Sequence, residues 1–111
     1  MEKKTIWLID IDGTVCEDIP NEEAHRFREA EVLPGALEKV TKYFERGDRI
    51  TFFTARSMDH MTATEYWLRT NGFAGMYEKV VYGKPRINEG EEYVWVDNKP
   101  VSAHYVPEGL K

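Results

Sequence analysis

The sequence predicts an α/β fold built on a mainly parallel sheet. Short apolar, β-branched segments alternate with segments of helical periodicity along the chain, which is the pattern of strands connected by helices. Segment 6–9 is apolar at every position, and segment 49–54 is β-branched or aromatic at every position after Arg49, as expected for buried strands. The 111 residues are enough for one domain covering 1–111.

Composition limits the classes of function. Hydrophobic residues make up 41% and aromatic residues 13% of the chain, which indicates a globular protein. A net charge of −5 disfavours nucleic acid and anionic membranes as partners. The single cysteine, Cys16, rules out an intrachain disulfide and is predicted to be buried. The first apolar run is too short for a signal peptide or a membrane span, so we expect a cytoplasmic protein.

Two carboxylates, Asp10 and Asp12, directly follow the strand predicted over 6–9. Like charges this close need a cation, a shared proton or hydrogen bonds to compensate them. An ordinary acidic turn is one interpretation. A calcium loop of the EF-hand type is excluded, because its sixth and twelfth positions would be Val15 and Asn21 instead of Gly and Glu. The third interpretation is a phosphorylatable catalytic centre, which requires a hydroxyl, a lysine and another acid at later strand ends.

The remaining elements follow from periodicity and from turn residues. Leu37, Val40 and Phe44 lie on one helical face, with Pro34 at the start and Gly47 after the end. A second helix is capped by Ser57 or Asp59 and ends near residue 71, before Gly72. The predicted elements are a short helix over 22–30, helices over 34–46 and from 57 or 59 to about 71, and strands over 6–9, 49–54, 79–82 and 93–96.

A residue suited to phosphate or metal chemistry follows each predicted strand. These are Asp10 with Asp12, then Thr54, Lys84 and Asp97. Because the carboxyl ends of parallel strands meet at one edge of the sheet, residues far apart in the chain become neighbours there. The requirement of the catalytic interpretation is therefore met.

These segments resemble the motifs of the haloacid dehalogenase (HAD) superfamily of phosphatases and phosphotransferases. The matching segments are Asp10-Ile11-Asp12-Gly13-Thr14, Phe52-Phe53-Thr54, Gly83-Lys84-Pro85 and Val94-Trp95-Val96-Asp97. The resemblance covers nearly the whole chain. It implies a Rossmann-like three-layer sandwich and a phosphomonoester hydrolase that works through an aspartyl-phosphate intermediate.

The resemblance also implies a role for each residue. Asp10 is the expected nucleophile, and Asp12 is the general acid and then the general base. The expected Mg²⁺ is held by Asp10, the backbone carbonyl of Asp12 and Asp97. Thr54 and Lys84 are expected to bind phosphate oxygens, and Arg56 faces either the substrate or the solvent. Many family members have a second acid where this chain has Asn98, which makes metal affinity the weakest point of the assignment.

The intervals from Asp12 to Thr54 and from Thr54 to Lys84 are too short for a cap domain, so the chain resembles the capless branch of the family. An open site must be closed by a flap over about 15–32, by a large substrate or by a second subunit. The acidic balance favours a small phosphorylated metabolite, such as a sugar phosphate, over nucleic-acid ends. Two alternatives are a phosphate-binding module without turnover and, more distantly, a receiver domain of two-component signalling. The three tryptophans, Trp7, Trp67 and Trp95, are expected in the core.

Overall fold

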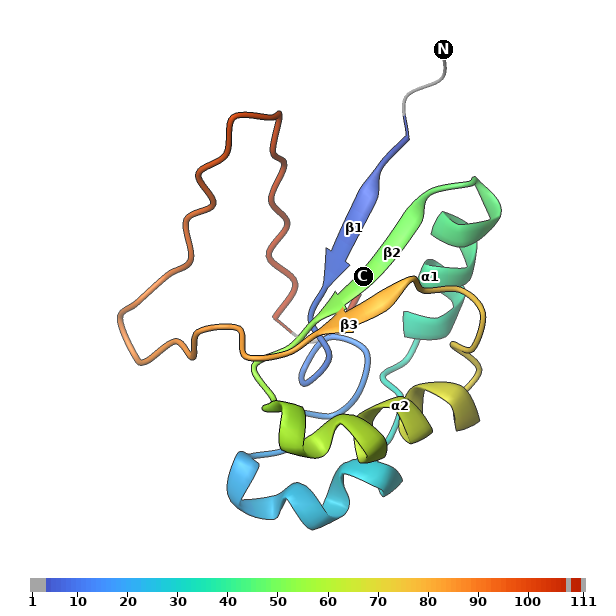
Figure 1. Cartoon of the computed structure of the whole chain (residues 1–111), viewed down its shortest axis with the longest axis vertical. Helices are drawn as coiled ribbons and strands as arrows, with labels where there is room; N and C mark the ends of the chain where they lie inside the picture. The colour runs from blue at the N-terminus through green and yellow to red at the C-terminus, as the bar shows by residue number, and fades with distance from the viewer. Residues whose placement is uncertain (1–3, 108, 111) are drawn as a thin grey trace.

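The computed structural model describes residues 4–107, 109 and 110. Its sheet is parallel and has three strands in the order β1 (Ile6–Ile9), β2 (Arg49–Phe53) and β3 (Lys79–Val81) (Figure 1). In the register, Ile9 lies opposite Phe52. The predicted α/β fold with a parallel sheet is confirmed, and these three strands match the predicted segments closely.

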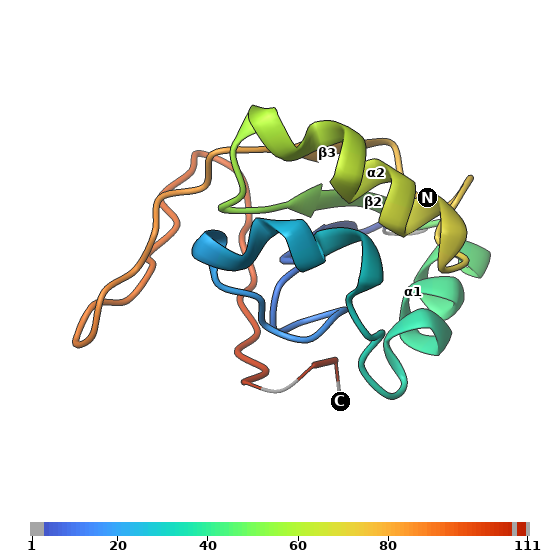
Figure 2. The same cartoon turned by 90° about the horizontal axis from the view of Figure 1, so that it is seen from below.

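Helical segments connect the strands (Figure 2). They are η1 (Asn21–Glu29), α1 (Ala36–Glu45), η2 (Met58–His60) and α2 (Met61–Thr70). The helix predicted from Pro34 begins later, because Gly35 adopts a left-handed conformation with φ 81° and Pro34 lies in the preceding turn. The predicted side-chain cap of the second helix is wrong, since η2 precedes α2 and neither helix has a side-chain capping hydrogen bond.

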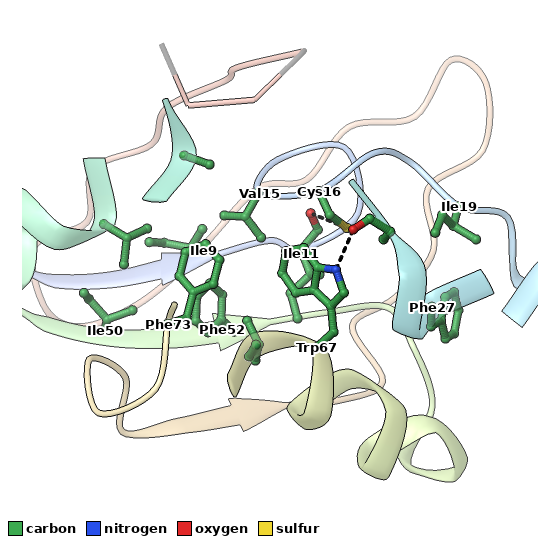
Figure 3. Packing of buried hydrophobic residues seen from close by; sticks show 14 residues of the cluster. Ile9, Ile11, Val15, Cys16, Ile19, Phe27, Ile50, Phe52, Trp67 and Phe73 are labelled. Atoms are coloured by element: carbon green, nitrogen blue, oxygen red, sulfur yellow. Dashed lines mark hydrogen bonds between the residues drawn. The ribbon is translucent and has the colours of Figure 1, made fainter. Parts of the chain in front are cut away.

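The hydrophobic core lies against the face of the sheet that carries Trp7, Ile9, Ile50 and Phe52. Residues of α1, α2 and η1 fill it (Figure 3). Burial of such side chains is the main favourable term in folding, at about 25 cal/mol per Å². The fourteen buried residues of this cluster are Ile9, Ile11, Val15, Cys16, Ile19, Phe27, Ala30, Ala36, Val40, Ile50, Phe52, Trp67, Leu68 and Phe73.

Through a hydrogen bond, Trp67 connects α2 to the segment that follows η1. Its indole Nε1 donates a hydrogen bond to the carbonyl oxygen of Ala30 over 2.7 Å, drawn as a dashed line in Figure 3. Its ring also stacks on Phe73, with the centroids 5.7 Å apart. Burial of Trp67, which is 1% exposed, therefore satisfies a backbone carbonyl as well as filling space.

Side chains alternate between the faces of the sheet, and the opposite face is more open. Ile6 and Leu8 are 53% and 46% exposed. The predicted three-layer sandwich would place helices over this face. In the structure Trp95 lies against Phe53 there, with the ring centroids 6.4 Å apart.

Residues 85–105, here called the arm, loop away from the sheet (Figure 1). The predicted fourth strand over 93–96 is wrong: these residues are in no strand, and Val94 and Val96 are 75% and 90% exposed. Trp95, also expected in the core, is 50% exposed. An apolar run forms a strand only when its backbone pairs with a sheet edge, and among the described residues, 93–96 pair with none. The Tyr93 hydroxyl donates a hydrogen bond to the carbonyl of Pro85.

The ends of two loops are held by backbone hydrogen bonds. Glu17 N–H donates to the carbonyl of Glu31, and Leu33 N–H donates to that of Val15. These bonds join the two ends of the segment 15–32, which was predicted to be a flap. Beyond the arm, Gly109 N–H donates to the carbonyl of Gly13, 3.0 Å away, and Leu110 packs against the core. Among the residues the structure describes, no helix is long and apolar enough to cross a membrane.

Candidate active site

Asp10 stands directly after β1 and is held by two donors. Lys84 Nζ donates to Oδ1 over 3.0 Å, and the Thr14 hydroxyl donates to Oδ2 over 3.3 Å. Burial raises the pKa of Asp10 above its ordinary value of 3.8, while the Lys84 ammonium opposes this shift. With its side chain 34% exposed, Asp10 is a carboxylate that remains accessible beside a cation.

The loop after β3 brings Lys84 to the end of β1. Thr54 N–H donates to the carbonyl of Val81, and Lys84 N–H donates to the carbonyl of Thr54 over 3.0 Å. Gly83, whose φ of 81° favours glycine, forms the turn between them. The carboxyl ends of β2 and β3 are thereby joined, and the expected neighbourhood of Asp10, Thr54 and Lys84 is present.

Asp12 is paired with Arg56 in a two-pronged ion pair. Arg56 Nε donates to Oδ2 over 2.9 Å, and an Nη donates to Oδ1 over 2.7 Å. The Arg56 side chain is only 1% exposed, so it does not face the solvent. A bidentate contact of this kind fixes the plane of the carboxylate as well as balancing its charge.

Arg56 is held in turn by two other elements. Its second Nη donates to the Thr64 hydroxyl on α2 over 3.0 Å, and its guanidinium carbon lies 3.8 Å from the centroid of the Phe27 ring on η1. Such stacking suits the planar guanidinium. Sequence reasoning did not find Phe27 or Thr64 as neighbours of the site; their only signal was an apolar spacing, which identifies a buried face and not what it touches.

Thr54 and Cys16 complete the buried floor of the site. The Thr54 hydroxyl accepts a hydrogen bond from Arg56 N–H over 3.1 Å, and the threonine is fully buried. Cys16 is buried as predicted, with Sγ 3.8 Å from Asp12 Oδ1. Burial, reinforced by the Asp12 charge, raises the pKa of the Cys16 thiol to about 12, so this cysteine stays protonated.

Asp97 is not brought to this cluster. It lies on the exposed arm, where its carboxylate accepts hydrogen bonds from the Trp95 indole and from Lys99 N–H. Within residues 4–107, 109 and 110, no group of three acidic, histidine or cysteine side chains is placed to hold a metal ion. The donor set for the expected Mg²⁺ is therefore incomplete in this arrangement, because Asp97 lies on the arm while Asp10 lies beside Lys84.

A carboxylate flanked by an ammonium and a hydroxyl at the carboxyl edge of a parallel sheet suits covalent phosphoryl transfer. A family model described as HAD superfamily, subfamily IIIB (acid phosphatase), matches residues 1–94. The chain therefore belongs to this family of the HAD superfamily, as its motifs indicated.

Two individual proteins are also similar to this chain. A protein of Oceanobacillus iheyensis named "Putative nucleotidase" is 36% identical over 81 residues, which are 67% of this chain and 43% of that protein. The chain thus spans less than half the length of this curated relative. A crystal structure of a Vibrio cholerae protein matches with a TM-score of 0.64 at 20% identity, covering 81% of this chain and 78% of that one; this likeness shows the fold.

Proposed function

We propose that this protein hydrolyses phosphomonoesters through an aspartyl-phosphate formed on Asp10. The observation that carries the proposal is the Asp10 carboxylate held between Lys84 Nζ at 3.0 Å and the Thr14 hydroxyl at 3.3 Å. Membership of an acid phosphatase family supports it. A structural turn would have no need of a partly buried lysine from a strand end more than seventy residues away.

The reaction has two steps. An oxygen of Asp10 attacks phosphorus, the bond from phosphorus to the ester oxygen breaks, and the leaving oxygen takes a proton from Asp12. Water then attacks the phosphorus of the acyl-phosphate, Asp12 accepts the proton, and the Asp10 carboxylate and inorganic phosphate are released. Lys84 balances the charge of the phosphate oxygens, which is the main requirement of phosphoryl transfer. The Thr54 hydroxyl, expected to bind phosphate, is neutral and fully buried, and its part is to hold the backbone of Arg56 at the end of β2.

Mg²⁺ belongs to the proposal as the cation that neutralises the transferring phosphoryl group. Asp10, the Asp12 backbone carbonyl and Asp97 would hold the ion. In this structure Asp97 lies on the exposed arm, so the proposed coordination requires the arm to fold back toward the end of β1. Crossing the sheet from β3 covers about 15 Å, and the eleven residues 82–92 span up to about 36 Å when extended.

This metal arrangement is tested by Mg²⁺ binding, measured by calorimetry on the native chain and on Asp97→Asn. We expect weaker Mg²⁺ binding in Asp97→Asn and none of this loss in Glu92→Gln, which removes a charge from the same exposed arm. Equal Mg²⁺ affinity in all three proteins would remove Asp97 from the ligand set.

The proposed substrate is a small phosphorylated metabolite. A sugar phosphate fits the acidic balance of the chain, and a nucleoside monophosphate is favoured by the relative named as a nucleotidase. The activity test is phosphate release from sugar phosphates, nucleoside monophosphates and a 5′-phosphorylated oligonucleotide with Mg²⁺. Asp10→Asn should abolish release, while Asp59→Asn, an exposed acid at the start of the α2 region, should keep it.

The aspartyl-phosphate on Asp10 can be detected directly. Borohydride reduces an acyl-phosphate, so treatment during turnover should convert Asp10 to homoserine, detected by mass spectrometry of the peptide that contains it. Absence of phosphate release from every substrate, with phosphate analogues still bound, would favour the phosphate-binding module without turnover.

Closure of the site is also part of the proposal. The segment 15–32 lies next to Asp12 through Cys16; a large substrate and a second copy of the chain are the other candidates to exclude water from the site. Solution mass, measured by light scattering with and without substrate, tests the second copy: a monomer under both conditions leaves closure to residues 15–32 or to the substrate.

A further inference from the structure

We propose that Arg56 is a positioning residue: it holds the Asp12 carboxylate in a fixed orientation for proton transfer and does not bind the phosphate of the substrate. This inference rests on the proposed function, in which Asp12 moves the proton. It assigns to Arg56 a task different from the expected contact with substrate or solvent.

The donors of Arg56 are already used inside the protein. Nε and one Nη contact the two oxygens of Asp12 at 2.9 and 2.7 Å, and the other Nη contacts the Thr64 hydroxyl at 3.0 Å. With the side chain 1% exposed, a phosphate could reach the guanidinium only by displacing these bonds. Displacement would leave the buried Arg56 guanidinium and the partly buried Asp12 carboxylate without their partners, which is costly.

Each of the two cations of the site thus pairs with a different acid. Lys84 Nζ contacts Asp10 with its side chain 16% exposed, whereas Arg56 contacts Asp12 with its side chain 1% exposed. A lysine offers a single charged point, but the guanidinium fork fixes both oxygens and the plane of the carboxylate. An incoming phosphate can therefore also contact Lys84, the partner of Asp10, but it cannot contact Arg56, the partner of Asp12.

The packing around Arg56 makes this orientation dependent on η1 and α2. Phe27 from η1 covers one face of the guanidinium at 3.8 Å, and Thr64 from α2 fixes its edge. A misplacement of about 1 Å of a catalytic group costs up to about a hundredfold in rate. The contact between η1 and α2 consequently sets where the proton of Asp12 is delivered.

The leaving group distinguishes positioning from phosphate binding. A sugar or alkyl phosphate needs the proton when its oxygen departs, whereas p-nitrophenol leaves without help. Arg56→Lys keeps a positive charge but not the fork. We expect it to lower kcat/KM, which reports formation of the aspartyl-phosphate, about ten- to a hundredfold for the alkyl phosphate and at most about threefold for p-nitrophenyl phosphate. Because Asp12 also accepts the proton of the attacking water, kcat should fall for both substrates, while the inhibition constant of inorganic phosphate should stay nearly unchanged. Thr64→Val should give a smaller loss with the same preference.

Three results would overturn the assignment. A rise of more than tenfold in KM, or in the inhibition constant of inorganic phosphate, with kcat kept would make Arg56 a phosphate ligand. Equal losses of kcat/KM for both substrates would make its role merely structural. Unchanged kcat for both substrates would leave Arg56 no role in proton transfer.

A measurement without turnover separates this proposal from the proposed function. The Arg56 Nε–H signal, assigned in a ¹⁵N spectrum by its loss in Arg56→Lys, should exchange slowly and should shift in Asp12→Asn and in Thr64→Val. Saturation with inorganic phosphate should leave it in place. If no phosphomonoester is hydrolysed but this pattern holds, the proposed function fails while the positioning of Asp12 by Arg56 stands. A shift of the signal with phosphate would refute the positioning of Asp12 by Arg56.

Discussion

Replacing Trp67 by phenylalanine tests the join between α2 and the segment after η1. The change removes the donor that reaches the carbonyl of Ala30 over 2.7 Å and leaves this carbonyl buried, at about 1–3 kcal/mol. It also removes part of a side chain that is 1% exposed, which costs about 1–2 kcal/mol for the lost apolar contact and the void. The free energy of unfolding should therefore fall by about 2–5 kcal/mol.

Urea unfolding followed by far-UV circular dichroism measures this change. Because small domains are stable by only about 5–15 kcal/mol, the variant should unfold at a clearly lower urea midpoint with an unchanged slope. Tyr66→Phe is the matched control, since Tyr66 is the neighbouring aromatic residue of α2 and is 39% exposed. We expect a change within about 0.5 kcal/mol for the control. A loss below about 1 kcal/mol for Trp67→Phe would show that the bond to Ala30 contributes little.

Three further predictions concern charged and titratable groups. Lys84→Met should lower kcat/KM about a hundredfold or more, with the exposed Lys79→Met as control, and unchanged kinetics would exclude Lys84 from the site. Asp48 accepts bonds from the Trp7 indole and from Arg46, which lower its pKa below 3.8; Asp48→Asn should thus lower the melting temperature at pH 7, and the difference from the native chain should shrink as the pH falls below about 4. A difference that persists at pH 2 would mean that the charge of Asp48 is not its cause. Because burial raises the pKa of the Cys16 thiol to about 12, a thiol reagent at pH 8 should label unfolded chain quickly and native chain hardly at all.

The first part of the site was predictable because its signals are local. Asp10 and Asp12 directly follow an apolar strand, and Thr54 ends another. The order of parallel strands then brings these ends together, so Lys84 reaches Asp10 across 74 positions of sequence. The apolar residues that predict these strands are the same ones that pack them into the sheet, so the predicted and observed strands agree.

The partner of Arg56 and the course of the arm depend on contacts that the pattern does not encode. A buried arginine needs an acid and a packing surface, but neither Phe27 nor Asp12 is near Arg56 in the chain. For residues 93–96, the apolar run predicted a strand, yet a strand also needs an edge to pair with, and the structure leaves this segment exposed. Tertiary context decides both cases, as it commonly does for β-propensity.

The exposed arm has a consequence for how the chain can be rebuilt. Its tip is the turn at 88–91, where Asn88 and Glu91 bond to each other, and beyond the arm Gly109 bonds to Gly13. Insertion and circular permutation succeed at exposed tips whose backbone bonds are local. New chain termini, or an inserted folded domain, should therefore be tolerated at 88–91 with the sheet and the Asp10 cluster intact, which makes this tip the natural place to attach a reporter.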